Sequence, residues 1–414
     1  MDQKEALLER FLRYVAVPTQ SDPKAATVPS NPKEFDLARL LADELKTMGF
    51  VDVEVSEYAV VTGKLPSNLP AGTKAPKVGW CTHMDTVNIG KSGDIHPQVI
   101  RGYKGGDICL NKEKDVWLSV KDHPEVERYK GDDLVVTDGT TVLGADDKSA
   151  VANVMTAMDI VIRENRPHGD IWVCFVPDEE IGLLGSKKID FKKFPVDFAY
   201  TIDCCELGEV VWETFNAGSA FLTVEGVSAH PMSSKNVLVN PVMVVHDFLN
   251  MLDRGTMPEF TEGREGFILP KSLTASPSQA KLLINIRDHS KAGYEAKKAL
   301  LKQAVEFLKV RHTRAVISYT QEDVYSNIAD AVTPEKRSCI DLLYKALEEV
   351  GVKAKTIAMR GGTDGSYIST QGIPTPNYFT GAHNFHSVCE FMPMSSWVKS
   401  LEVTLKLVEL TAKA

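Results

Sequence analysis

The chain has 414 residues, of which 43% are hydrophobic and 25% charged, with a net charge of −9. This length predicts two or three domains, and the acidic balance argues against nucleic acid or an anionic membrane as a partner. The N-terminus is polar and has no apolar signal core, and no run is long enough to span a membrane. Seven cysteines show no paired spacing. We therefore expect a cytoplasmic protein with reduced thiols.

Helices and strands alternate along the first half of the chain. Helical periodicity predicts helices over residues 5–15, 31–49 and 148–165. Short apolar or alternating runs predict strands over residues 51–58, 77–81, 170–176 and 198–202. Residues 86–140 are rich in Gly, Asp and Lys, which indicates loops with few strands. This order is typical of an α/β domain with a mixed sheet flanked by helices, whose site lies at the strand ends.

The pattern changes near residue 213. Strands are predicted over 219–227, 267–275, 279–287 and 315–320, with helices over 240–252 and 294–311. This β-α-β-β-α-β order is that of a ferredoxin-like unit. We interpret residues 213–321 as an inserted lid domain, because they hold none of the candidate metal ligands. Residues 1–212 and 322–414 would form the catalytic domain, with a helix at 334–350, a strand at 355–359 and a helix at 395–413.

An acidic triplet follows the strand predicted at residues 170–176. It consists of Asp178, Glu179 and Glu180. Adjacent carboxylates at a strand end point in different directions, so one can bind a metal while the other moves a proton. A solvated charged patch explains the triplet poorly, because it directly follows a buried strand.

Further candidate ligands follow or lie near other apolar runs. His83 ends one strand, and Asp85 two residues later can accept the second ring N–H of a metal-bound His. Asp146 and Asp147 precede a helix, where Asp also serves as cap and dipole partner. We expect one of this pair, Asp146, to bridge two metals and the other to support the turn.

Two more segments complete the ligand set. Asp203 follows the strand at 198–202, and either His383 or His386 near the C-terminus can ligate. The set suits two Zn, Co or Mn ions about 3.5–4 Å apart that share one carboxylate. The candidate ligands are His83, Asp146, Glu180, Asp203 and His386.

Other motifs are weaker or absent. His230 follows Ala229 in the inserted domain, where a surface turn is the simpler explanation. Arg360, in a Gly-rich loop, can clamp a carboxylate with two hydrogen bonds. The sequence has no P-loop, no H-E-x-x-H and no G-x-S-x-G, which argues against nucleotide, zincin and serine-hydrolase sites.

Taken together, the motifs resemble a family of cocatalytic-metal exopeptidases and amidohydrolases related to carboxypeptidase G and succinyl-diaminopimelate desuccinylase. Within it, the chain resembles the aminopeptidases that cleave tripeptides. The matching segments keep the family's order from one end of the chain to the other. They are residues 82–86, 137–148, 177–182, 229–231, 359–365 and 384–391.

The resemblance implies roles for the candidate residues. His83, Asp146 and Asp203 would bind one metal, and Asp146, Glu180 and His386 the other. His386 is preferred to His383 because the family's ligand stands four residues before a Glu, here Glu390. The remaining implied roles are support of the site by Asp85, general-base catalysis by Glu179, oxyanion stabilisation by His230, and substrate binding by Arg360 with Asn285 or Asn240.

The implied activity is hydrolysis of the N-terminal residue from short peptides, with Glu179 activating a water that bridges the metals. In dimeric relatives the equivalent of His230 comes from the partner, so a homodimer through the inserted domain is also implied. Met232 stands where the family tends to have Gly, which leaves the strictness of a tripeptide preference open. The alternatives are an N-acyl-amino-acid or dipeptide amidohydrolase and a non-catalytic peptide-binding relative.

Overall fold

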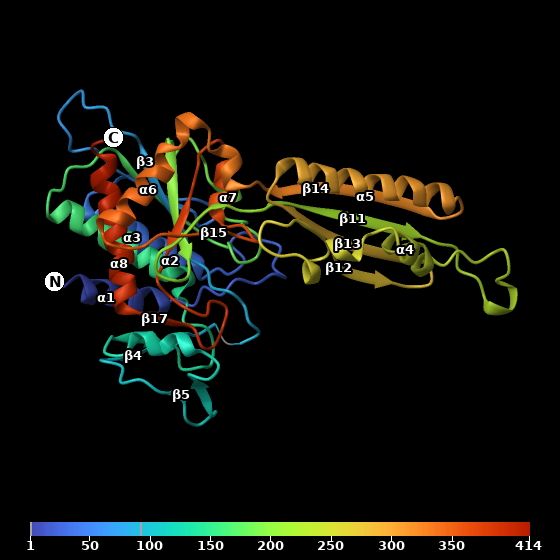
Figure 1. Cartoon of the computed structure of the whole chain (residues 1–414), viewed down its shortest axis with the longest axis horizontal. Coiled ribbons are helices and arrows are strands. Elements are labelled where there is room, and N and C mark those ends of the chain that lie inside the picture. The colour runs from blue at the N-terminus through green and yellow to red at the C-terminus, as the bar shows by residue number, and fades with distance from the viewer. Residues whose placement is uncertain (1, 92) are drawn as a thin grey trace. The chain divides into compact units, whose positions relative to one another are not determined.

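The computed structural model describes residues 2–91 and 93–414, and the chain divides into two compact units (Figure 1). Unit 1 comprises Met1–Trp212, Ala331–Ile357 and Thr363–Ala414, and unit 2 comprises Glu213–Asp330 and Ala358–Gly362. Unit 2 extends beyond the expected end at residue 321, because its last strand is longer than the sequence pattern indicated.

Unit 1 is built on an eight-stranded mixed sheet. In spatial order its strands are β1 (Val51–Val55), β2 (Val61–Leu65), β8 (Ile171–Val176), β3 (Val78–His83), β9 (Phe198–Cys204), β16 (Asn377–Phe379), β10 (Glu209–Glu213) and β15 (Lys355–Ala358). The central strands β8, β3, β9 and β16 run parallel. Strand β1 pairs antiparallel with β2, β2 with β8, and β10 with β16. Every residue of β3 and β8 is buried, as expected for central parallel strands. The predicted mixed α/β architecture is confirmed.

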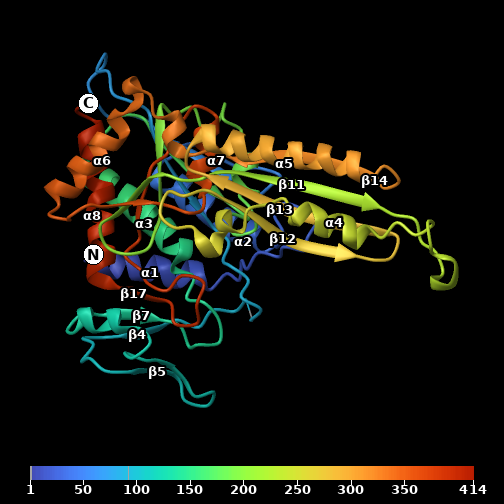
Figure 2. The same ribbon diagram turned by 45° about the vertical axis from the view of Figure 1, so that its right-hand side comes forward.

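Helices flank this sheet (Figures 1 and 2). They are α1 (Gln3–Val15), α2 (Glu34–Met48), α3 (Ala145–Arg163), α6 (Ser338–Glu349), α7 (Asp364–Thr370) and α8 (Met394–Thr411). Helix α3 is buried along most of its length, because α1, α8 and the sheet strands β3 and β9 all pack against it. Helix α7 packs on the same two strands. Among the described residues, no helix has both the length and the apolar character needed to cross a membrane.

Helix α2 begins three residues later than the sequence indicated. The Asn31 side chain donates to the carbonyls of Pro18 and Gln20 and accepts from the Lys33 N–H, so it ties a loop together instead of capping the helix. The helix ends as predicted at Gly49, which adopts the left-handed conformation that favours glycine.

Short strands lie in the segment at 86–140, for which the sequence indicated loops with few strands. Strands β4 (Gln98–Ile100), β7 (Leu134–Val136) and β17 (Phe391–Pro393) form an antiparallel sheet, and β5 (Ile108–Asn111) pairs with β6 (Val116–Leu118). Because β17 follows the predicted ligand His386 closely, this small sheet anchors a segment of the candidate site.

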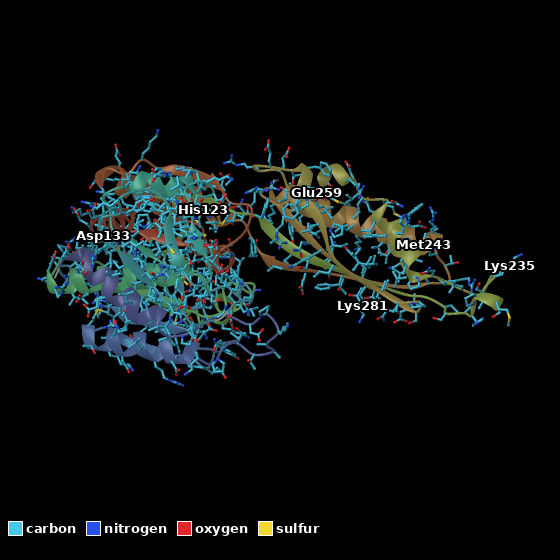
Figure 3. The ribbon with its side chains drawn as sticks, turned by 90° about the horizontal axis from the view of Figure 1, so that it is seen from below. His123, Asp133, Lys235, Met243, Glu259 and Lys281 are labelled. Atoms are coloured by element: carbon cyan, nitrogen blue, oxygen red, sulfur yellow. The ribbon has the colours of Figure 1, made fainter. Side chains whose placement is uncertain are left out.

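Unit 2 has the expected β-α-β-β-α-β order. Its elements are β11 (Asn216–Glu225), α4 (Pro241–Leu249), β12 (Phe267–Ala275), β13 (Gln279–Asp288), α5 (Lys291–Arg311) and β14 (Val316–Tyr325). The antiparallel sheet has the order β12-β13-β11-β14. Both helices pack against one sheet face, where alternate residues of β13 such as Leu282 and Ile284 are buried. Figure 3 labels Met243 on α4 and Lys281, which alternates with those buried residues and is exposed.

Candidate metal centre

The predicted ligands of unit 1 meet at one edge of its main sheet. His83 ends β3, Asp203 lies near the end of β9, and Glu180 follows β8 by four residues. Asp146 lies at the start of α3. The carboxyl ends of neighbouring parallel strands lie together, which explains how residues far apart in the chain share one site.

Asp146 lies at the centre of this group. Its two carboxylate oxygens face two different histidines: Oδ1 is 3.0 Å from His83 Nε2, and Oδ2 is 3.0 Å from His386 Nε2. His386 Nε2 is also 3.0 Å from Glu180 Oε1. One carboxylate is thus shared between two sets of nitrogen and oxygen donors, as a bridging ligand would be.

Asp147 and Asp203 extend the cluster on one side of Asp146. Carboxylate oxygens of these three residues lie within 4.8 Å of one another. Atoms of His83, Asp146 and Glu180 form a second such group among the residues that the structure describes. Asp147 also accepts a hydrogen bond from the His83 N–H at 3.3 Å, which links the start of α3 to the end of β3.

Asp85 is fully buried and connects two strand ends. Its oxygens accept the backbone N–H groups of Glu179 at 2.9 Å and Glu180 at 3.2 Å. Its Oδ1 also lies 3.3 Å from His83 Nδ1. The Asp85 carbonyl oxygen is nearer, at 3.1 Å from His83 Nδ1, and the two oxygens together fix the ring so that Nε2 faces the Asp146 side. Asp85 therefore orients a histidine and the acidic triplet together.

Burial and mutual repulsion shift the pKa values of these groups in opposite directions. Hydrogen bonds with Asp146 and Glu180 raise the pKa of His386 to about 10. Burial would raise the pKa of Asp146, but hydrogen bonds from His386 and His83 bring it well below its ordinary value. Burial and the nearby Asp146 charge raise the pKa of Glu180 to about 7 and that of Asp203 well above its usual range. The cluster has more carboxyl groups than its two histidines can balance, so ionisation of all of them is unfavourable without a cation.

This donor set fits divalent metal ions. Imidazole nitrogens and carboxylate oxygens are the ligands that Zn, Co and Mn take in proteins. Among the described residues, the buried oxygen Asp147 Oδ1 has no hydrogen-bond partner. Buried carboxylate oxygens normally have a partner, and a cation would supply one here.

Two loop contacts that the sequence pattern did not reveal hold the acidic triplet. Asp178 has a left-handed backbone, with φ of 54°. Its carboxylate accepts hydrogen bonds from both the N–H and the hydroxyl of Ser30, at 2.7 and 2.5 Å. The Asp178 N–H in turn donates to the buried Glu34 at 3.2 Å. Ser30 and Asp178 are too far apart in the chain for local periodicity to link them. The only sequence signal for this contact is a polar Ser shortly before the start of a helix.

His383 and His386 have separate environments. His383 is buried, lies 2.7 Å from the Tyr129 hydroxyl through Nε2 and stacks on Phe391. Burial lowers the pKa of His383 to about 4, so it remains neutral. His386 faces Asp146 and Glu180 instead. The two histidines thus differ in what their rings contact, although they are only three positions apart in the chain.

The remaining predicted residues lie in unit 2. His230 is exposed, and its Nδ1 accepts the Met232 N–H at 3.2 Å. Asn240 caps α4 by accepting the Val242 N–H, and Asn285 is half-buried on the sheet face away from the helices.

Arg360 is held by groups of unit 2. Its guanidinium donates to the Glu265 carbonyl at 2.7 Å and to the Thr261 hydroxyl at 2.8 Å, and it lies over the rings of Phe215 and Phe267. These contacts give Arg360 a structural role that its motif alone did not indicate.

Comparisons with known proteins place the chain in one family. The profile of "Peptidase family M20/M25/M40" matches residues 135–410. A peptidase T-like protein of Yersinia pestis is 50% identical and covers 99% of this chain and 98% of its own length. Peptidase T of Clostridium acetobutylicum is 41% identical and covers 99% of this chain and 100% of its own.

Solved structures share the fold. Aminopeptidase PepT from Bacillus cereus superposes with a TM-score of 0.76 at 19% identity, and a tripeptidase from Staphylococcus aureus with 0.75 at 20%. Each comparison covers 99% of both chains. The chain therefore belongs to peptidase family M20/M25/M40 and is a metallo-aminopeptidase similar to peptidase T.

Proposed function

We propose that the chain removes the N-terminal residue from short peptides, tripeptides foremost, at a centre of two zinc ions, with Co or Mn as substitutes. The arrangement of Asp146 carries this proposal, because its two oxygens each lie 3.0 Å from a different histidine. The preference for tripeptides is supported by the full-length similarity to peptidase T and by the fold shared with a tripeptidase.

We assign the ligands as follows. His83 and Asp203 hold one ion, Glu180 and His386 hold the other, and Asp146 is shared. When bound, two such ions polarise a carbonyl oxygen and lower the pKa of water. The 3.0 Å separation of His386 Nε2 from Glu180 Oε1 supports their assignment to one ion. The spacing of the carboxylates within the cluster favours cations among them.

Glu179 serves as the general base in this proposal. Its backbone N–H is fixed by Asp85 at 2.9 Å. Burial, and the nearby Asp203 and Asp364 charges, raise the pKa of its carboxyl group well above the ordinary value. A carboxylate of raised pKa takes a proton from the attacking water and returns it to the leaving amine more readily than an ordinary one.

Unit 2 supplies groups for the substrate. His230 Nδ1 accepts a backbone N–H, so the proton lies on Nε2 of the neutral ring and is available to an oxyanion. Binding of the substrate's backbone or carboxylate by Arg360, with Asn285 or Asn240, rests on the resemblance of the motifs. A homodimer through unit 2 and a cytoplasmic location also belong to this proposal, and the seven free cysteines accord with the latter.

A substrate panel tests the proposal. The protein is stripped of metal, loaded with Zn or Co, and assayed on di-, tri- and tetrapeptides, N-terminally acetylated tripeptides and N-acetyl amino acids. We expect turnover of free tripeptides in proportion to bound metal, and release of the first residue. Hydrolysis confined to N-acyl amino acids or dipeptides would replace the aminopeptidase by the related amidohydrolase, and binding without turnover would indicate a peptide-binding protein.

A further inference from the structure

A buried carboxylate outside the proposed ligand set contacts the Asp146 turn from the far end of the chain. Glu390 is 1% exposed and lies directly before β17. We propose that Glu390 is a positioning residue, which holds the turn carrying the shared ligand Asp146 and ties it to the segment carrying His386. This inference rests on the metal centre proposed above and adds a residue that determines its geometry.

Three backbone N–H groups converge on the Glu390 carboxylate. Oε2 accepts from Leu143 at 2.6 Å and Gly144 at 2.9 Å, and Oε1 accepts from Asp146 at 3.0 Å. Gly144 has φ of 74°, which aims its N–H beside that of Leu143. Both oxygens are therefore committed to the backbone of one turn, and the Asp146 N–H belongs to the proposed bridging residue itself.

The carboxylate is the form that these contacts require. A proton on Glu390 would find no acceptor among these three partners, because all of them are donors. Hydrogen bonds from N–H groups to a charged oxygen are roughly twice as strong as neutral ones.

Glu390 also stands on a rigid support. The next residue, Phe391, is buried and pairs with Val136 in the small sheet, and it exchanges backbone hydrogen bonds with His383. His386 lies between these paired residues and has φ of 61°. Glu390 thus joins two ligand-bearing segments that are 240 residues apart at Asp146 and His386. A shift of either segment would change the spacing between the two ligands.

The Glu390→Gln variant tests the proposal with little change of volume. In the parent, both carboxylate oxygens accept N–H groups of the turn. In the variant, the amide NH₂ replaces one of these oxygens, so one donor faces another donor and at least one hydrogen bond is lost. We expect Zn²⁺ affinity, measured by competition with a chromophoric chelator, to fall roughly 10- to 100-fold, as for other groups that orient ligands. The absorption spectrum of the Co²⁺-loaded protein should also change, because that spectrum reports ligand geometry.

Glu125→Gln is the matched control. Glu125 holds the same segment by accepting from Asn384 Nδ2 at 3.0 Å. Within the described part of the chain, its side chain also pairs with His123, which lies outside the Asp146 turn. We expect this variant to keep the parent affinity and Co²⁺ spectrum. Equal spectral changes in both variants would show a general effect of loosening the segment, and would overturn the specific role of Glu390.

The outcomes separate this inference from the proposed function. If the unaltered protein binds no Zn²⁺ or Co²⁺, the metal centre itself is wrong. If it binds two ions and Glu390→Gln binds them with the same affinity and spectrum, only the positioning role is overturned. If Glu390→Gln does not fold, Glu390→Asp is tested instead. This variant keeps the negative charge, but its side chain is one methylene shorter, so the carboxylate lies farther from the turn. Weaker metal binding by that variant supports the role, and unchanged binding contradicts it.

Discussion

At the scale of single residues, Asp146 and Glu179 are suited to different roles in the candidate centre. Asp146 is held between two histidines, which keep its pKa low and its carboxylate charged. Glu179 has its backbone fixed by Asp85 but its pKa raised by burial. The same residue type is thus suited to bind a cation at one position and to carry a proton at another, because the neighbours differ.

The Glu179→Gln variant separates metal binding from proton transfer. The amide cannot accept a proton from water, whereas none of the proposed ligands is altered. We expect kcat on tripeptides to fall roughly 100- to 10,000-fold, with the metal content unchanged when measured by elemental analysis. Glu57→Gln, at an exposed position in unit 1, serves as the control and should keep full activity. Full activity in Glu179→Gln would remove it from the mechanism.

At the scale of elements, ionic contacts fasten helix α1 to the small sheet. Asp133, which Figure 3 labels, accepts from Lys4 of α1 at 2.6 Å and from Arg101 at 2.9 Å. The Gly102 N–H adds a third bond to its carboxylate at 2.7 Å. Although burial opposes the shift, these cations and the N–H lower the pKa of Asp133 to about 2.

This pKa predicts how stability depends on pH. A carboxyl whose pKa is lower in the folded state stabilises the fold above its unfolded value near 3.9. The contribution is lost as pH falls through about 2. We expect Asp133→Asn to cost about 1 kcal/mol of unfolding free energy at pH 7, because Arg101 is half exposed.

Urea unfolding at pH 7 and pH 3 measures this dependence. The difference between Asp133→Asn and the parent should be smaller at pH 3, since protonation of the unfolded chain has already removed part of the contribution. Asp52→Asn, an exposed change, should show no such trend. A difference that stays constant with pH would exclude an ionic origin.

At the scale of the whole molecule, the chain has two units, of which one holds the proposed metal ligands and the other has a hydrophobic core of its own. All five proposed ligands lie in unit 1, whereas unit 2 has its own core between its sheet and helices α4 and α5. Each of the chain's five tryptophans also lies in unit 1. Tryptophan fluorescence therefore reports unfolding of the unit that holds the candidate centre.

Removal of metal should destabilise one unit selectively. A ligand at 1,000 times its Kd stabilises the state that binds it by about 4 kcal/mol. We expect EDTA to lower the tryptophan-monitored melting temperature, and restored Zn²⁺ to recover it. A calorimetric transition for unit 2 should not move. An equal shift of both transitions would show that metal binding stabilises the two units together.

Local patterns in the sequence determined much of the architecture and the identity of the candidate ligands. The apolar run of β8 followed by Glu179 and Glu180 indicated a buried strand that ends at a site, and the order of elements in unit 2 followed from periodicity alone. Periodicity predicts these elements because buried side chains recur about every 3.6 residues in a helix and every two residues in a strand with one buried face. A strand that is buried on both faces is a continuous apolar run. Three-residue strands such as β16 are too short to produce such a signal.

Tertiary structure alone decided which distant groups meet. His386 reaches Asp146 across 240 residues, Ser30 reaches Asp178 across 148, and Glu390 reaches Leu143 across 247. Local propensity carries no information on these pairs, because each forms only when packing brings the ends of a long segment together. The sequence by itself therefore determined the ligand types and the strands that present them. The folded chain decided how they are spaced, since that spacing depends on buried hydrogen bonds between segments far apart in the chain.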